Sequence, residues 1–226
     1  MRLVLGNTRT NRVTCALVLA ALLLFLPRSA GAHSDPIRSE PAVGSVVFLP
    51  PAQEGSVGTF RMRTWLSERA ERNFSFLEVV DSTGRRVDVA GSLTFENQGA
   101  VIAVDVAPAQ IGEHKARYRL LSAVDGHINT GEYSFYVAEA LPGAGSRLPA
   151  LPREFAIRVP KALGASSISI TLLRNGANFF SGSAPFADAQ DSDVATLGLP
   201  EGAAGNYEVR WELATNRGPK FGSYTF

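Results

Sequence analysis

The chain has 226 residues, with 22 lysines and arginines against 21 aspartates and glutamates, so its formal net charge is +1. No basic stretch remains outside the amino-terminal segment, so we expect no nucleic-acid partner. The single cysteine, Cys15, excludes an intrachain disulfide framework and a cluster of thiolate metal ligands. The length allows one large domain or two small ones.

Residues 1–32 have the layout of a secretory signal peptide. Arginines precede an almost unbroken apolar run at 13–26, which is followed by the small residues at 30–32. The apolar run is shorter than the roughly 20 residues that a membrane span needs. We therefore expect cleavage after Ala32, and an uncleaved anchor is the alternative.

Cleavage after Ala32 would change the composition of the protein. It would remove four arginines, no acidic residue and the only cysteine, so the formal charge would become −3. About 194 residues would remain, enough for one or two domains. The exported chain is expected to be stable without a disulfide and to contain no transmembrane segment.

The predicted cut makes His33 the first residue of the mature protein. A free α-amine and the imidazole Nδ1 of the same residue can close a chelate ring around one metal ion. Cleavage after Ala30 would instead start the chain at Gly31 and place His33 third, which is also a Cu(II)-chelating arrangement. His33 is therefore the first candidate metal ligand.

Several segments after residue 58 have the pattern of β-strands. They are four to eight residues long, contain β-branched and aromatic residues, and are separated by Gly, Pro, Asn and Asp. No long segment has a convincing helical period. The pattern predicts an all-β fold, an antiparallel, immunoglobulin-like β-sandwich. The predicted strands of the first unit lie at 60–65, 74–79, 101–106, 116–121 and 132–137.

A second candidate ligand set is the sequence Asp125-Gly126-His127. Asp-Gly is a common turn pair, so one interpretation is a tight connection with a solvated histidine. If the segment is extended, however, Asp125 and His127 project to the same side and can share an ion. With the amine and imidazole of His33 they supply three nitrogens and one oxygen, a set that favours Cu(II). The absence of thiolates and the presence of only two methionines argue against a Cu(I) site.

Residues 139–152 are rich in Pro, Gly and small residues and are predicted to be a linker. After it, the order of strands and turns recurs in residues 153–226. This recurrence predicts a second, similar β-sandwich, either by duplication or because sandwiches share such patterns. Asn216 and Gly218 stand where the first unit has Asp125 and His127, so the second unit is expected to lack metal ligands and to be structural or partner-binding.

The first unit resembles the CopC-like copper-resistance proteins over residues 33–138. Its start matches their pattern H-A-x-L-x-x-S-x-P-A-x-G, although Ser34 and Pro36 replace the usual Ala and Leu. Three further motifs follow in the family's order. They are Trp65-Leu66-Ser67-Glu68, Asp81-Ser82-Thr83-Gly84-Arg85-Arg86-Val87, and Ser122-Ala123-Val124-Asp125-Gly126-His127 with Gly131-Glu132-Tyr133-Ser134-Phe135.

The resemblance implies a periplasmic β-sandwich that binds one Cu(II) per chain through His33, Asp125 and His127. It implies that Glu68 is a further ligand or a near neighbour of the site. It also implies a role in copper resistance, sequestration or delivery, with an inner-membrane copper transport protein as the usual partner.

Two further residues depart from the family pattern. Val124 is an extra residue before Asp125, and His114 stands where the family has Tyr, so we expect His114 to be packed inside the fold. The methionine-rich Cu(I) motif of some members is missing.

Two other function classes stay open. An amino-terminal histidine chelate with another histidine also builds copper oxygenase centres, but these need an open copper face without a strong carboxylate in the plane. Asp125 and Glu68 argue against such an enzyme, so no catalytic residue is expected. A metal-free scaffold or adhesion module is the third interpretation, and it applies if the signal is cut elsewhere.

Overall fold

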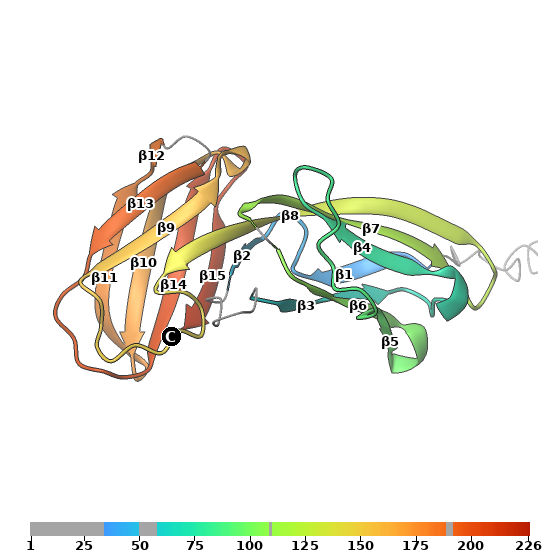
Figure 1. The fold of residues 1–226 in the computed structure, drawn as a ribbon, viewed down its shortest axis with the longest axis horizontal. Helices are drawn as coiled ribbons and strands as arrows, with labels where there is room; N and C mark the ends of the chain where they lie inside the picture. The colour runs from blue at the N-terminus through green and yellow to red at the C-terminus, as the bar shows by residue number, and fades with distance from the viewer. Residues whose placement is uncertain (1–33, 50–57, 109, 189–191) are drawn as a thin grey trace, which may run out of the picture. The chain divides into compact units, whose positions relative to one another are not determined.

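The computed structural model describes residues 34–49, 58–108, 110–188 and 192–226, which fall in a single compact unit. Within these residues the fold consists of β-strands and three short 3-10 helices (Figure 1). The all-β prediction is confirmed, and all strand pairs but one are antiparallel. The 3-10 helices are η1 (Arg72–Phe74), η2 (Asn97–Gly99) and η3 (Lys161–Leu163).

One four-stranded sheet belongs entirely to the first half of the chain. Its order is β1-β3-β6-β5, with Phe60 opposite Val106 and Arg63 opposite Ala103. Alternate residues of β3 are buried, as the period of two in its sequence predicts. The strands are β1 (Pro36–Glu40), β3 (Phe60–Leu66), β5 (Thr94–Glu96) and β6 (Val101–Val106).

A larger sheet has the order β12-β13-β9-β8-β7-β4, and β2 pairs with β8 in parallel. This parallel pair is an exception among the otherwise antiparallel strand pairs of the described residues. The strands are β2 (Val46–Phe48), β4 (Phe76–Val80), β7 (Gly112–Leu121), β8 (Ile128–Leu141), β9 (Glu154–Pro160), β12 (Ala187–Asp188) and β13 (Ser192–Gly198).

Strand β8 is longer than its sequence pattern suggested. It pairs with β7 through Val137 and then with β9 from Glu139 to Leu141. The first three residues of the predicted linker therefore continue the strand, because Ala140 is buried and the backbone finds partners on β9. The Pro-Gly signal that ends it begins only at Pro142.

A second four-stranded sheet, β11-β10-β14-β15, lies in the second half of the chain. Trp211 of β14 faces Gly222 of β15, and a Cβ atom on Gly222 would lie 2.3 Å from Trp211 Cζ2. Glycine is therefore required where the indole crosses the neighbouring strand. The strands are β10 (Ala165–Arg174), β11 (Ala177–Pro185), β14 (Tyr207–Thr215) and β15 (Lys220–Thr225).

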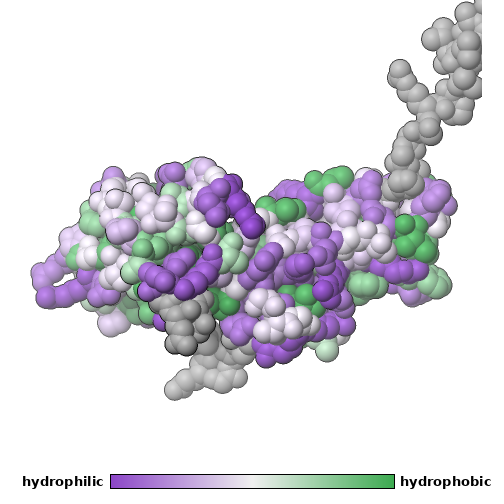
Figure 2. Space-filling view, turned by 90° about the horizontal axis from the view of Figure 1, so that it is seen from above, coloured by the Kyte–Doolittle hydropathy of each residue, from purple (hydrophilic) through white to green (hydrophobic). Residues whose placement is uncertain are grey.

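Buried apolar residues form two clusters. One packs between the sheets of the first half, with Met62, Ile102 and Phe135 among its fully buried members. The other is centred on the second half and includes Phe48 of β2, whose ring lies 5.0 Å from that of Trp211. Hydrophilic residues cover most of the face shown in Figure 2, with apolar residues in small separate areas. Side chains that alternate along a strand point to opposite faces, so burial of one face in these clusters explains the period of two in the predicted strands.

Two sequence expectations are resolved near these cores. The strand predicted at 74–79 begins two residues later, because Phe74 closes η1 and is exposed. His114 is fully buried and stacks on Phe135 with a centroid distance of 5.7 Å, as the packed interpretation required.

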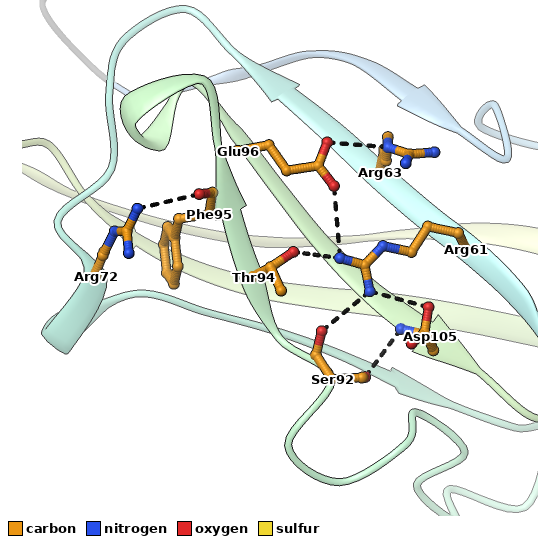
Figure 3. A network of polar contacts seen from close by, with 8 residues as sticks. All are labelled: Arg61, Arg63, Arg72, Ser92, Thr94, Phe95, Glu96 and Asp105. Atoms are coloured by element: carbon orange, nitrogen blue, oxygen red, sulfur yellow. Dashed lines mark hydrogen bonds and ion pairs between the residues drawn. The ribbon is translucent and has the colours of Figure 1, made fainter.

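The outward face of β3, β6 and β5 carries a network centred on Arg61 (Figure 3). Its guanidinium donates to Asp105 Oδ1 at 3.0 Å and to the Ser92 carbonyl at 3.1 Å, and it also contacts Thr94 Oγ1. Glu96 lies 3.5 Å from the same group. Because these partners come from two separate segments, residues 92–96 and β6, the network holds β3 in place, and the end of β3 leads directly to Glu68.

Arg61→Ala is expected to lower the free energy of unfolding by about 1–2 kcal/mol, since it removes several contacts of a three-quarters buried side chain at once. Urea unfolding measures this. The matched control is Arg153→Ala, whose ion pair with Glu201 is 85% and 84% exposed and should contribute almost nothing. Equal losses in the two variants would contradict a cooperative network.

Candidate metal site

Asp125, Gly126 and His127 lie in the turn that joins β7 to β8. The Ser122 amide donates to the His127 carbonyl at 2.8 Å, and the Gly126 amide donates to the Ser122 carbonyl at 3.1 Å. Gly126 has a φ of +75°, which a residue with a Cβ atom rarely adopts. The turn interpretation of this sequence is therefore confirmed, and both candidate ligands are on it.

Asp125 and His127 are in direct contact. His127 Nδ1 lies 2.6 Å from Asp125 Oδ2, and the His127 amide donates to Asp125 Oδ1 at 3.0 Å. These two hydrogen bonds, the backbone one first, lower the pKa of Asp125 to about 2, so it is an anionic oxygen donor at neutral pH. When Nδ1 donates to a carboxylate, the imidazole lone pair is on Nε2. The His127 side chain is 66% exposed and that of Asp125 is 19% exposed.

The amino-terminal end of the described chain lies beside this turn. Ser34 is buried and donates from Oγ to the Arg69 carbonyl at 3.3 Å, and the Ala123 amide donates to the same carbonyl at 2.8 Å. Asp35 and Ser67 exchange two further hydrogen bonds of 2.9 Å. Ser34 and Ala123 thus donate to the same Arg69 carbonyl. Ser34 directly follows His33 in the sequence, and Ala123 lies two residues before Asp125.

Glu68 contacts the same turn from the segment after β3. Its Oε2 accepts a hydrogen bond of 2.8 Å from Ser122 Oγ. Two backbone hydrogen bonds hold the segment after Glu68 in place. The Ala70 amide donates to the Gly99 carbonyl at 2.9 Å, and the Glu71 amide donates to the Leu121 carbonyl at 2.8 Å. The fold therefore brings Glu68, Asp125 and His127 to one end of the sandwich.

Comparison with known proteins finds a matching domain family. The CopC domain family matches residues 37–138, which include β1, the Ser67–Glu71 region and the whole turn. Residues 37–138 form a CopC domain.

Individual relatives are distant. The copper transport protein CutJ of Bacillus subtilis (strain 168) is 26% identical over 134 residues, and the match covers 58% of this chain but only 23% of CutJ. The crystal structure of CopC from Methylosinus trichosporium OB3b is 23% identical, with 47% of this chain and 95% of that chain covered and a TM-score of 0.37. A chimeric titin Z1Z2-Z1Z2 tandem covers 85% of this chain and 96% of its own at 10% identity and a TM-score of 0.28.

One predicted ligand of the CopC domain has no described position. His33 lies outside the described residues. Among the residues that the structure does describe, no group of three or more His, Cys, Asp or Glu side chains is arranged to hold a metal ion.

The second half of the chain has a different arrangement at its corresponding turn, between β14 and β15. Thr215 Oγ1 donates to the Gly218 carbonyl at 2.6 Å. The Asn216 backbone amide donates to the Gly164 carbonyl at 3.0 Å. The Asn216 side chain covers Gly164 so closely that a Cβ atom at position 164 would lie 2.5 Å from Asn216 Nδ2. Asn216 is thus used in packing the turn.

Three residues that organise the CopC domain's turn were not singled out from the sequence. Ser34 and Ser122 are buried hydroxyls with hydrogen-bonding partners, and Arg69 contributes only its carbonyl. A serine that begins a turn, as Ser122 does before Asp125-Gly126, is a recognisable signal for side-chain capping of the following amides. A backbone carbonyl has no signal in the sequence.

Proposed function

We propose that this protein is an exported carrier that holds one Cu(II) ion through His33, Asp125 and His127. It serves copper resistance, sequestration or delivery rather than catalysis. The observation that carries the proposal is the shared Arg69 carbonyl, which keeps Ser34 next to the turn of Asp125 and His127. His33 immediately precedes Ser34, so an amino-terminal histidine would be only one residue away from the hydrogen bond to the Arg69 carbonyl.

The donor chemistry supports Cu(II) as the ion. The α-amine and imidazole of His33 and the imidazole of His127 supply nitrogen, and the ionised Asp125 supplies oxygen. Mixed N,O ligation suits tetragonal Cu(II), which also has the highest affinity of the common divalent ions for such ligands.

The proposed place of action is the periplasm, after removal of residues 1–32, which lie outside the described residues. No helix within the described ranges is long and apolar enough to cross a membrane. The partner we propose is an inner-membrane copper transport protein that exchanges copper with the carrier. The similarity to CutJ, named a copper transport protein, supports a copper-related role for this chain.

We also propose that residues 153–226 form a second sandwich unit without metal ligands, after a linker. This half has its own four-stranded sheet and a large share of one apolar cluster. The carboxyl-terminal end of β8 pairs directly with β9, so the two halves of the chain share one sheet. Experiments on the metal site should therefore use the complete mature chain.

The mass of the exported protein tests the proposal most directly. Intact-mass spectrometry should give a chain that starts at His33 and a mass increase of one copper after Cu(II) loading. A Gly31 start would overturn the histidine-first site while leaving a different copper chelate. Failure to retain copper would favour a metal-free module, and ascorbate-dependent substrate oxidation by the loaded protein would favour an enzyme.

A further inference from the structure

The buried hydroxyl of Ser122 is the centre of the hydrogen bonds that shape the metal turn. Ser122 is only 2% exposed. Its Oγ accepts from the Val124 amide at 3.1 Å and from the Asp125 amide at 3.3 Å, and it donates to Glu68 Oε2 at 2.8 Å. All of its hydrogen-bonding capacity is thus used within the site region.

The direction of each hydrogen bond follows from counting protons. A hydroxyl has one proton and two lone pairs, and both amides must donate. The Ser122 hydroxyl donates its single proton to Glu68 Oε2 at 2.8 Å, and the Asp125 carboxylate is a second acceptor within reach of the same hydroxyl. Glu68 thereby sets the rotamer of Ser122 and turns its lone pairs toward the Val124 and Asp125 amides.

We propose that Glu68 and Ser122 are positioning residues that fix the Asp125–His127 turn, and that Glu68 acts through Ser122 and not as a copper ligand. The inference rests on the function proposed above. The path is continuous: Glu68 holds Ser122, Ser122 holds the Asp125 amide, and Asp125 holds both the amide and the imidazole of His127. Residues that orient metal ligands affect affinity without touching the ion.

Glu68→Gln separates positioning from ligation. The glutamine side-chain oxygen still accepts the Ser122 proton, but the anionic donor is lost. We expect Glu68→Gln to retain wild-type Cu(II) affinity within about 3-fold and an unchanged Cu(II) EPR spectrum. A spectrum that shows loss of an oxygen donor, with a large loss of affinity, would overturn the proposal and make Glu68 a ligand.

Ser122→Ala tests the other half of the path. It leaves the Val124 and Asp125 amides without their acceptor, and we expect Cu(II) binding to weaken by about 10–100-fold with a broadened EPR spectrum. Ser122→Thr keeps the hydroxyl and should restore both readouts. Glu68→Ala should weaken binding in the same manner, and the double variant Glu68→Ala/Ser122→Ala should be no weaker than Ser122→Ala alone.

A measurement without copper keeps the inference independent of the proposed function. In the metal-free mature protein, hydrogen exchange at the Val124 and Asp125 amides should be faster in Ser122→Ala than in wild type, with the other β7 and β8 amides unchanged. Unchanged exchange at both amides would overturn the positioning role. If Asp125→Ala and His127→Ala bind copper like wild type, the proposed function fails, whereas the exchange result still decides the role of Ser122.

Discussion

Asp125→Ala and His127→Ala should each weaken Cu(II) binding by more than about 100-fold, because each removes a proposed ligand and also breaks the contact that orients the other. Neither change should unfold the protein. Both residues lie in an exposed turn, where substitutions usually alter the free energy of unfolding by no more than about 0.5 kcal/mol. Competition titration with a chromogenic chelator measures the affinity, and urea unfolding measures the stability.

Glu201→Ala is the matched control for the loss of one carboxylate. Glu201 is exposed and forms an ion pair with the exposed Arg153 in the second half of the chain, so this variant should bind copper like wild type. Wild-type affinity in both turn variants would contradict the ligand set. A loss of affinity together with a large loss of stability would instead show that the turn is structural.

His114→Phe should stabilise the metal-free protein, and the gain should grow as the solution becomes acidic. Burial lowers the pKa of His114, against smaller opposing effects of the Gly112 carbonyl and the Asp81 charge. Its Nε2 is buried and has no hydrogen-bond partner within the described residues. Phenylalanine keeps the stacking on Phe135 and removes that buried polar atom, a gain of about 1–3 kcal/mol. The loss of the 3.2 Å contact between His114 Nδ1 and the Gly112 carbonyl reduces this gain by about 0.5–1.5 kcal/mol.

The sign of the pH dependence follows from proton binding. Between the lowered pKa of the folded state and the ordinary histidine value of about 6.5, the unfolded chain binds a proton that the folded chain does not. Wild-type stability should therefore fall as the pH drops below about 6.5, by up to about 1.4 kcal/mol per pH unit, and His114→Phe should remove this slope.

Urea unfolding of both proteins from pH 7.5 to pH 5 tests this expectation. Hydrogen bonds from Thr83 and Arg85 overcome the effect of burial and lower the pKa of Asp81, whose own loss of stability therefore occurs below about pH 4. The two effects fall in separate pH windows. Parallel stability curves for the two proteins above pH 5 would show that His114 binds its proton as readily in the folded protein as in the unfolded chain, which would contradict a lowered pKa.

Much of the fold follows from local sequence patterns. Alternation of apolar and polar residues predicted β3 and most of β7, because one face of each strand is buried in the core. Strand β6 was predicted from its short run of β-branched residues, and it is buried on both faces. The Asp-Gly pair predicted the turn between β7 and β8, since Gly126 adopts the positive φ that such turns need. These signals depend on neighbouring residues only.

Features that depend on distant partners were not predictable in this way. The three-residue strand β2 and its parallel pairing with β8 have too few residues to form a pattern. The continuation of β8 past Val137 depends on β9, which follows more than ten residues later. Phe74 has strand propensity, but the 3-10 turn overrides it.

The candidate site was predictable to a similar degree. Asp125, His127 and Glu68 carry side-chain chemistry that a motif can display, and the fold brings all three to one end of the first sandwich. The hydrogen bonds that hold them use Ser34, Ser122 and backbone groups, whose roles depend on burial and long-range contacts. Such roles are visible only in three dimensions.

The shared carbonyl of Arg69 has a consequence for how the site can vary. Every residue type provides the same carbonyl oxygen, so the side chain at position 69 is open to substitution while the anchor persists. A change in the length of the segment between Ser67 and Glu71 is different, because it would move the acceptor away from Ser34 and Ala123 together. In a library of variants, this segment should therefore tolerate many substitutions and almost no insertions or deletions.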